Sequence, residues 1–382
     1  MGSRKSFLEG MGFMNIKKEL AETFGGSKVL ITGHTGFKGG WLALWLESLG
    51  AEVIGYSLDP PTKPSFFHET KISSRTKDIR GDVLDQNHLL HVLEAHRPEF
   101  IFHLAAQPLV KRSYIDPKDT FNVNIMGTVN LLESIRISQI PTICVCITSD
   151  KCYENKNWPY AYRENDPLGG FDPYSASKGA AEIVIASYRR SFFSPGPQSR
   201  NVAVASVRAG NIIGGGDWAE DRIVPDCIRS LSMGSPVHIR NPGAIRPWQF
   251  ILDPLLGYLY LARKMKKYPG MYEESWNFGP GYLNTINVRQ LADRIIQEWG
   301  HGCYEPSSSG GRNAFHEAST LMLDTAKTVT KLGWKPVYDI VQTVRETVAW
   351  YKNYYEKKED ASIFSYDQIE IFMKEAGKTF QE

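Results

Sequence analysis

The sequence contains few cysteines, and none of them has the spacing of a disulfide or zinc motif. There are five among 382 residues, an odd number with no C-x-x-C pair. This usage argues against a disulfide framework and favours a reducing compartment, so we expect a cytoplasmic protein. His88 and His91 share one face of an expected helix. They lack a convergent cysteine or carboxylate partner, so no metal site is expected.

The chain also lacks an excess of charge of either sign. Its 44 lysines and arginines face 42 aspartates and glutamates, for a formal net charge of +2. This balance gives no electrostatic reason to expect a nucleic acid or an anionic membrane as partner. No stretch approaches the ~18 apolar residues of a membrane-spanning helix. With 42% hydrophobic and 23% charged residues, the composition is that of an ordinary globular protein.

The first 27 residues lack an apolar core long enough for a secretory signal. They begin M-G-x-x-x-S, which matches the N-myristoylation pattern. Because so short a pattern arises easily by chance, we interpret residues 1–27 as an extension. The fold is then expected to start near Lys28.

From Lys28 onward, short apolar runs alternate with stretches of helical periodicity, which predicts β-α-β crossovers and a parallel sheet. The expected strands cover residues 28–32, 52–58, 100–104, 142–148 and 202–207, and the expected helices cover 41–49, 123–139 and 176–190. After Arg208 glycine and proline become frequent, and helical patterns follow at 288–299 and 341–355. The fold class is therefore α/β, with a doubly wound sheet and a smaller C-terminal lobe.

A glycine-rich segment, GHTGFKG, follows the first expected strand and opens a helix. Gly33 permits a tight turn, Gly36 lets a pyrophosphate approach the backbone, and Gly39 lets the helix pack closely on the strand. The spacing is G-x-x-G-x-x-G, not the commoner G-x-G-x-x-G. The strand–turn–helix context nevertheless indicates a dinucleotide site, with the candidate contacts Gly33, Thr35, Gly36, Phe37, Lys38 and Gly39.

Two acids downstream bear on the cofactor. Asp59 ends the second expected strand, where a carboxylate can bind the ribose hydroxyls and repel a 2′-phosphate, which favours NAD over NADP. It is equally well placed as a turn residue before Pro60. Asp82 follows a third strand and could lie near adenine, or it could cap a helix.

Two further segments carry candidate catalytic groups. Tyr174 and Lys178 form a Y-x-x-x-K, which puts phenol and ammonium on one helical face. A nearby cation lowers a phenol pKa from its usual value near 10, so Tyr174 could act as a base on a sugar hydroxyl. Ser149, Asp150 and Lys151 follow an expected strand at the edge where such sheets bind ligands. A solvated loop with a surface ion pair would look the same.

With these residues in place, the chain resembles the extended short-chain dehydrogenase/reductases, and among them the CDP-glucose 4,6-dehydratases. The resemblance runs from residue 31 to about 250, with weaker matches at residues 277–280 and 316–318. It is carried by ITGHTGFKGGWLALWL, GYSLDPP, HLAAQPLVKRSY, ITSDKCYEN, YRENDPLGGFDPYSASK, VRAGNIIGGGDWAEDRIVPD and RPWQF. The specific mark is Asp150-Lys151, because related dTDP-glucose and GDP-mannose dehydratases have Asp-Glu there.

The resemblance implies a Rossmann-type NAD domain over residues 28–207, with a returning segment near 245–275. It implies a mainly substrate-binding lobe over 208–382. The implied substrate is CDP-D-glucose and the implied cofactor is NAD. Hydride leaves C4 of the hexose, water is lost across C5 and C6, and hydride returns to C6. The product would be CDP-4-keto-6-deoxy-D-glucose.

The resemblance also assigns roles to residues. Tyr174 is the base at the C4 hydroxyl, Lys178 tunes it and contacts the nicotinamide ribose, and Ser149 steadies the C4 oxygen. Asp150 is the acid that protonates the departing C6 hydroxyl. Lys151 stands in the position of the C5 base, a role that requires a neutral amine and hence a lowered pKa.

Further contacts are expected by the same resemblance. Those to the cofactor are Asp82, Val83, Leu104, Ala105 and Ala106, and those to the substrate are Gln107, Asn211, Arg222 and Arg246. The guanidinium of Arg246 suits a bidentate contact to the diphosphate. A structural salt bridge is the competing interpretation for Arg222 and for Arg246.

Two alternatives stay open at this point. One is another dehydratase or a 4-epimerase acting on a dTDP-, GDP- or UDP-hexose, although an epimerase does not need the acid and base after the fifth strand. The other is a non-catalytic NAD-binding regulator, which the intact Ser149, Asp150, Tyr174 and Lys178 argue against. Because related enzymes pair through helices, a homodimer or homotetramer is expected.

Overall fold

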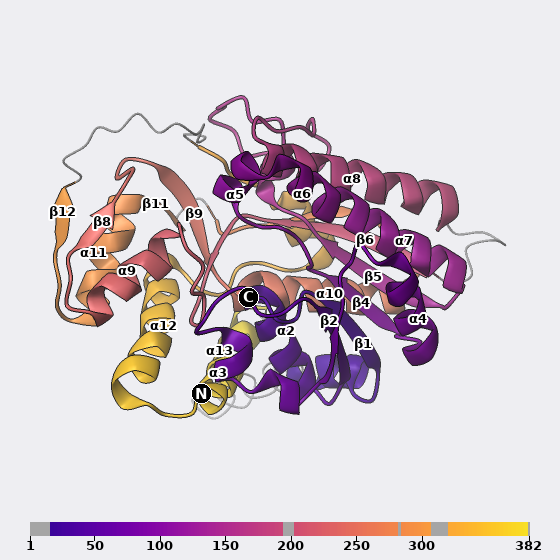
Figure 1. Ribbon diagram of the computed structural model, residues 1–382, viewed down its shortest axis with the longest axis horizontal. Helices are drawn as coiled ribbons and strands as arrows, with labels where there is room; N and C mark the ends of the chain where they lie inside the picture. Colours follow the sequence, from indigo (N-terminus) through magenta and orange to yellow (C-terminus); the bar gives the residue numbers. More distant parts are fainter. Residues whose placement is uncertain (1–15, 194–201, 282–283, 307–319, 381–382) are drawn as a thin grey trace, which may run out of the picture.

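The computed structural model places seven parallel strands in one central sheet, in the order β10-β6-β5-β4-β1-β2-β3 (Figure 1). It describes residues 16–193, 202–281, 284–306 and 320–380. The expected doubly wound α/β fold is confirmed. The strands are β1 Lys28–Thr32, β2 Glu52–Ser57, β3 Lys77–Arg80, β4 Phe100–His103, β5 Thr142–Ile147, β6 Val202–Ala209 and β10 Ser275–Phe278.

Side chains on the central strands alternate between two hydrophobic cores, as the period of a β-strand requires. In β1, Val29 and Ile31 belong to one core and Leu30 to the other. Both faces of the sheet are therefore covered, which is why its strands are apolar throughout. Cys144 and Cys146 share the second core, in agreement with a packing role.

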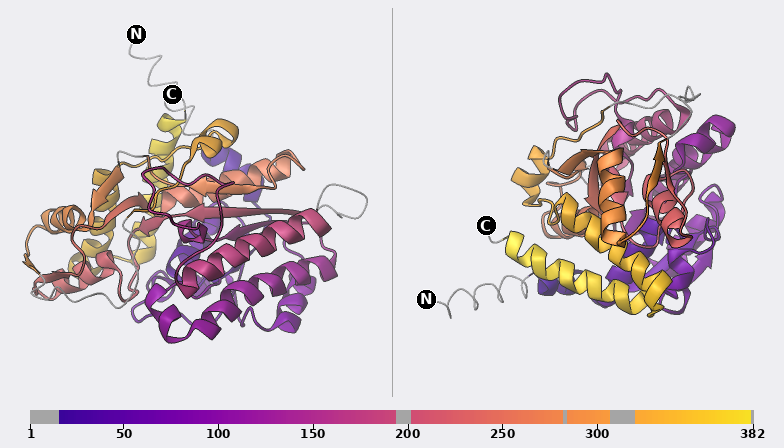
Figure 2. Two further views of the ribbon diagram at one scale, coloured as in Figure 1. Left: turned by 90° about the horizontal axis from the view of Figure 1, so that it is seen from above. Right: turned by 90° about the vertical axis from the view of Figure 1, so that its left-hand side faces the viewer.

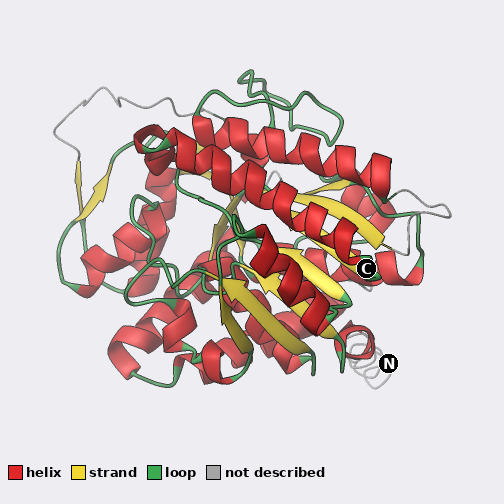
Figure 3. Cartoon of the chain, turned by 45° about the vertical axis from the view of Figure 1, so that its right-hand side comes forward, coloured by secondary structure: helices red, strands yellow, loops and turns green. Residues whose placement is uncertain are grey.

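Two layers of helices cover these faces, as Figure 3 shows from one side. One layer contains α4, α7 and α8, and the other contains α2, α10 and α13. Their bounds are α2 Phe37–Ser48, α4 Gln86–His96, α7 Gly127–Ser138, α8 Pro173–Phe192, α10 Leu252–Lys267 and α13 Ala361–Thr379. Among the described residues, no helix has the length and apolar character needed to span a bilayer.

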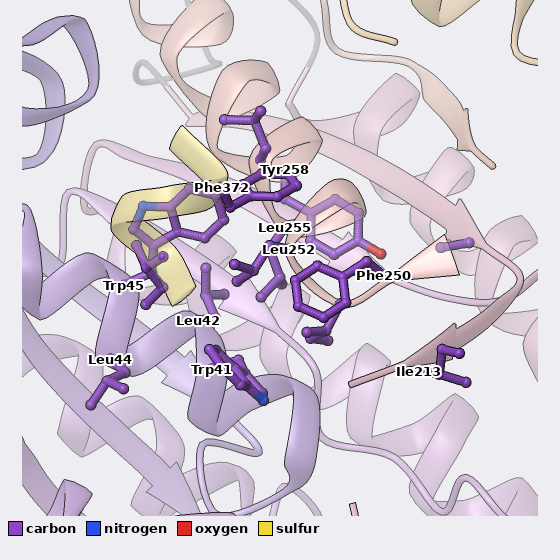
Figure 4. Close-up of a cluster of buried hydrophobic side chains, with 14 of the residues drawn as sticks. Trp41, Leu42, Leu44, Trp45, Ile213, Phe250, Leu252, Leu255, Tyr258 and Phe372 are labelled. Carbon is purple, nitrogen blue, oxygen red and sulfur yellow. The ribbon is translucent and has the colours of Figure 1, made fainter. Parts of the chain in front are cut away.

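The second layer holds a dense aromatic and aliphatic cluster (Figure 4). Trp41 and Trp45 of α2 lie with Leu255 of α10 and Phe372 of α13, and the rings of Trp45 and Phe372 meet edge to face at 5.9 Å between centroids. Helix α13 was not predicted from the sequence. Its packing shows that this late helix returns to α2, near the start of the central sheet.

A smaller lobe lies at one end of the sheet (Figures 1 and 2). Its elements are α9 Ile223–Ser232, α11 Val288–Trp299, α12 Ile340–Lys352, β8 Val237–Ile239 paired with β12 Tyr304–Pro306, and the three-stranded sheet of β7 Asn211–Ile213, β9 Ile245–Phe250 and β11 Thr285–Asn287. Short helices lie elsewhere in the chain: α3 Phe66–Glu69, α5 Val110–Ile115 and α6 Pro117–Phe121. The chain returns from the lobe to the central sheet through α10 and β10.

The packed fold begins earlier than Lys28. Residues 16–24 form a helix whose Ile16, Leu20 and Phe24 are buried at four-residue spacing. The ring of Phe24 lies 4.8 Å from that of Phe100 in β4. This apolar stripe faces the sheet, so the interpretation of all of residues 1–27 as an extension is wrong for 16–24. The M-G-x-x-x-S pattern lies outside the described residues.

We expect Phe24→Ala to lower the free energy of unfolding by about 3–5 kcal/mol, because it leaves a cavity against the central sheet. Lys18→Ala is the matched control, since Lys18 on the same helix is largely exposed and should change stability by less than about 0.5 kcal/mol. Denaturant unfolding measures both. Equal stability of the two variants would show that the helix does not belong to the core.

Candidate active site

The glycine turn after β1 brings the ends of two strands together. Gly33 has φ +81°, and a Cβ there would meet the backbone nitrogen of Ala105 at 2.8 Å. A Cβ on Gly39 would meet the carbonyl oxygen of Gly33 at 2.1 Å. Only glycine fits at these two positions. The turn therefore has the close backbone packing that a dinucleotide diphosphate requires.

Helix α2 begins directly at this turn. Gly36 is its N-cap and provides no side-chain cap, so the amides of the first turn face outward without a competing side-chain acceptor. The Thr35 hydroxyl lies 2.7 Å from that of Ser57 and donates to the carbonyl of Leu58. These contacts join the turn to the end of β2. The residues present fit a bound dinucleotide.

Asp59 is highly exposed after β2, with 91% of its side chain accessible, and lies 3.6 Å from Arg80 at the end of β3. Arg80 is itself held by Asp78 at 2.8 Å and by the carbonyl of Leu58. Asp82 accepts a hydrogen bond from the backbone of Leu84. It does not cap α4, because that N-cap is Asp85.

The end of β4 completes this side of the site. Leu104, Ala105 and Ala106 are half-buried beside the glycine turn, and Val83 is buried after β3. The side chain of Gln107 was expected to contact substrate. Its amide instead donates to Leu109 and Thr120, and its oxygen accepts from the backbone of Leu109. The structure thus uses Gln107 to hold its own loop.

Ser149 connects the candidate catalytic groups at the end of β5. Its hydroxyl donates to Asp150 at 2.9 Å and accepts from the backbone of Lys151 at 3.3 Å. It also shares a hydrogen bond with the Tyr174 phenol from the start of α8. Ser149, Asp150, Tyr174 and Lys178 are all at least nine-tenths buried. The two sequence segments therefore meet, as expected.

Burial dominates the electrostatics of Tyr174. It raises the pKa of this phenol to about 12, against the smaller lowering effects of the Ser149 hydrogen bond and the charge of Arg222. The pKa is therefore not lowered in the protein alone, and the lowering expected next to the lysine and nicotinamide cations stays a prediction. Burial likewise lowers the pKa of Lys178, to about 8.

A second, half-buried lysine lies among these groups. Desolvation and the positive charges of Lys178 and Arg222 together lower the pKa of Lys38 to about 7, while Asp150 opposes them. The glycine turn and the catalytic groups are therefore in electrostatic contact. The sequence placed Lys38 in the dinucleotide turn but gave no sign of this contact.

Asp150 is the expected acid of the site. Burial raises its pKa, whereas Lys151, Ser149 and Arg246 act to lower it. A raised pKa keeps a carboxylic acid protonated to higher pH, which suits a proton donor. Lys151 is half-buried beside it, in the short 3₁₀ turn Asp150–Cys152.

The lobe contributes three of the expected substrate residues. Arg246 in β9 is nine-tenths buried and close enough to act on Asp150. Arg222 precedes α9 and donates to Asp217 at 2.8 Å, so the structural salt bridge exists, yet its charge still reaches Tyr174. Asn211 is half-buried in β7, paired with Trp248 of β9. The weaker sequence match at residues 316–318 lies outside the described residues.

Two buried polar residues escaped the sequence analysis. Asn124 lies in the π-helical turn Asn122–Met126. Its side chain donates to Ser177 and to the carbonyl of Gln107, and it accepts from the backbone N–H of Gln107. It joins the β4 loop to the helix of Tyr174 and Lys178. Glu182 lies one turn beyond Lys178. The available signal in the sequence was a charged residue, Glu182, among small and apolar residues of the expected helix, which indicates a buried and paired carboxylate.

Known proteins share this arrangement of strands. The solved dTDP-glucose 4,6-dehydratase of Streptomyces venezuelae, with NAD and TYD bound, superposes with a TM-score of 0.72 at 21% identity, covering 87% of this chain and all of that one. The UDP-glucose 4-epimerase of Thermotoga maritima, solved with UDP-glucose, gives 0.72 at 22% identity, covering 86% of this chain and all of that one. At these identities the likeness concerns the fold.

Sequence relatives are more specific. The chain is 45% identical to the CDP-glucose 4,6-dehydratase of Salmonella typhimurium over 350 residues, which cover 91% of this chain and 96% of that protein. It is 26% identical to the dTDP-glucose 4,6-dehydratase of Haemophilus influenzae, over 85% of this chain and 97% of that one. Residues 30–347 match the family model described as GDP-mannose 4,6 dehydratase. The strand order, the glycine turn and the buried Ser-Asp-Tyr-Lys cluster agree with that match, and the chain belongs to the GDP-mannose 4,6 dehydratase family.

Proposed function

We propose that this protein is an NAD-dependent CDP-glucose 4,6-dehydratase, a lyase that converts CDP-D-glucose into CDP-4-keto-6-deoxy-D-glucose and water. The observation that carries the substrate assignment is the 45% identity to a CDP-glucose 4,6-dehydratase over nearly the whole chain. The relative from Haemophilus influenzae that is named for a dTDP sugar reaches 26%. The Asp150-Lys151 pair supports the same choice, because the resemblance associates Asp-Glu at this place with dTDP-glucose and GDP-mannose dehydratases.

NAD fits the residues of the glycine turn and of the strand ends beside it. Gly33 and Gly39 allow the close backbone packing that forms the turn, and the first amides of α2 would bind the diphosphate. The carboxylate of Asp59 would take the ribose hydroxyls. When bound, NAD supplies a reversible hydride acceptor, so that hydride taken from C4 can return to C6.

Tyr174 and Ser149 act at the C4 hydroxyl. Ser149 orients the sugar oxygen, and Tyr174 accepts its proton as C4 is oxidised. Because burial holds the pKa of this phenol near 12, proton transfer requires positive charge close to it. Lys178 supplies such charge from one turn further along α8, and its pKa near 8 leaves it mainly protonated at neutral pH.

Asp150 and Lys151 carry out the elimination. The 4-keto group acidifies the C5 proton, which the Lys151 amine removes in its neutral form. Asp150 donates its proton to the C6 hydroxyl, which leaves as water. The raised pKa of Asp150 supports this direction of transfer. Arg246 and Arg222 would hold the diphosphate so that C5 and C6 face these two groups.

We also propose that the enzyme is a cytoplasmic homo-oligomer. Ile137 of α7 and Ile183 and Phe192 of α8 are exposed by 43%, 59% and 46%, as expected of helices that pair with a second copy. The five cysteines are free, which supports a reducing compartment. The size of the native particle, measured by light scattering, tests the oligomer.

Incubation with CDP-, dTDP-, GDP- and UDP-glucose and GDP-mannose tests the substrate. The proposal expects the 4-keto-6-deoxy product from CDP-glucose with the highest kcat/KM. A higher kcat/KM with a dTDP-, GDP- or UDP-hexose would replace the substrate assignment. Conversion of UDP-glucose to its C4 epimer without loss of water would indicate an epimerase.

Tyr174→Phe removes one hydroxyl and little volume, so the variant should fold. Without the phenol no base accepts the C4 proton, and we expect kcat to fall by about 10²–10⁴-fold. Single-turnover absorbance of the reduced nicotinamide measures the loss. Conversion at nearly the parent rate would show that Tyr174 is not the base.

Lys151→Met tests the elimination. If Lys151 removes the C5 proton, the variant should still oxidise C4 and accumulate reduced nicotinamide, yet release almost no product. A variant that binds CDP-glucose weakly but dehydrates it normally at saturation would assign Lys151 to positioning.

A further inference from the structure

Glu182 is a carboxylate buried in α8, with 2% of its surface exposed. It lies on the same face of the helix as Lys178, one turn further along. Each of its oxygens is engaged. Thr148 donates to one, and Ser206 and Arg208 donate to the other, at 2.8 and 2.7 Å. Such full pairing is what a buried charge requires.

The donors to Glu182 come from the ends of neighbouring strands. Thr148 directly follows β5 and precedes Ser149, while Ser206 and Arg208 belong to β6. Burial alone would raise the pKa of Glu182. The charge and hydrogen bond of Arg208, with the hydrogen bonds from Thr148 and Ser206, instead hold this pKa below its usual value. Glu182 is therefore an anion that ties α8 to both strands.

Arg208 extends this hydrogen-bond network to the residue that follows the turn Asp150–Cys152. Its Nη1 atom donates to the Tyr153 hydroxyl at 2.6 Å and to the carbonyl of Glu164 at 3.0 Å. The Tyr153 hydroxyl in turn donates to Asn277 of β10 at 2.8 Å. Tyr153 directly follows the turn Asp150–Cys152.

The turn that carries Asp150 and Lys151 is thus fixed at both ends. Thr148 holds its start through Glu182, and Tyr153 holds its end through Arg208. Close packing supports the same geometry, because a Cβ on Gly179 of α8 would meet the carbonyl of Cys152 at 3.1 Å. The helix of Tyr174 and Lys178 and the turn of Asp150 and Lys151 share one buried anchor.

We propose that the Glu182–Arg208 ion pair is a positioning pair for the reaction: it sets the Asp150–Lys151 turn against α8 and places a buried anion one helical turn from Lys178. Neither residue contacts the sugar in this role. The pair coordinates the groups of the oxidation step with those of the elimination step.

Electrostatics at Lys178 agree with this role. The groups that face it are Glu182 from its own helix, Cys146 of β5, Cys152, His103 of β4 and Lys38 of α2. Burial lowers the pKa of His103 to about 3 and raises that of Cys152, so both are neutral at physiological pH. Glu182 is therefore the anion that offsets the burial of Lys178.

Glu182→Gln tests the charge. The amide keeps the shape of the side chain but loses the anion, so the pKa of Lys178 should fall. In single-turnover oxidation of CDP-glucose, the loss of rate at high pH should then begin about one pH unit or more below that of the parent. A folded variant, verified by its Tm, whose rate falls equally at every pH would overturn the proposal.

Tyr153→Phe tests the positioning without disturbing the ion pair. Loss of one hydroxyl should free the end of the turn and lower kcat about 10-fold to 100-fold, with KM for CDP-glucose near that of the parent. Tyr258→Phe in α10 is the matched control, since its buried hydroxyl has no partner among the described residues. A kcat for Tyr153→Phe equal to that of the control would overturn the proposal, including where Glu182→Gln fails to fold.

This inference rests on the proposed dehydratase function, and different experimental results would overturn the function and the positioning role. A parent enzyme that makes no 4-keto-6-deoxy product from any nucleotide hexose overturns the function. A parent that is active, with both variants behaving like the parent, overturns the positioning pair alone.

Discussion

Parallel pairing of the seven central strands is the constraint on which the site depends. Consecutive parallel strands are joined by crossover connections, so that every strand runs in the same direction and all carboxyl ends lie at one edge of the sheet. The carboxyl ends of β1, β4, β5 and β6 therefore lie together, although residues 33 and 210 stand far apart in sequence. Gly33 lets β1 close onto β4, and Gly210 after β6 lies so near Asp150 that a Cβ would stand 3.1 Å from its carboxylate. The fold thus supplies one crowded edge for both the cofactor and the chemistry.

Burial decides the charge of the groups at this edge. It raises the pKa of Tyr174 to about 12 and lowers that of Lys178 to about 8. The same desolvation raises the pKa of Asp150. An acid with a raised pKa and a cation with a lowered one suit proton transfer nearer neutral pH. The cost is that each group depends on neighbours for its charge state, as Lys178 depends on Glu182.

Local patterns in the sequence predicted most of the fold and pointed to candidate site residues that the structure brings together. The strand at 28–32 and the helix at 288–299 were predicted at their observed bounds, because short β-branched runs and helical periodicity are local signals. Residues 16–24 and α13 were not assigned, since their helices are recognised by packing against β4 and α2. The engaged side chain of Gln107 and the raised pKa of Tyr174 also depend on burial, which no local motif reports. The Glu182–Arg208 pair joins residues of α8 and β6, and only the tertiary structure brings them into contact.

The proposed mechanism depends on an internal return of hydrogen from C4 to C6, and isotope labelling follows this transfer itself. CDP-glucose carrying deuterium at C4 should give a product with that deuterium at C6. The same reaction in D₂O from unlabelled substrate should place solvent deuterium at C5. Loss of the C4 label to solvent, or a product without solvent deuterium at C5, would contradict the account.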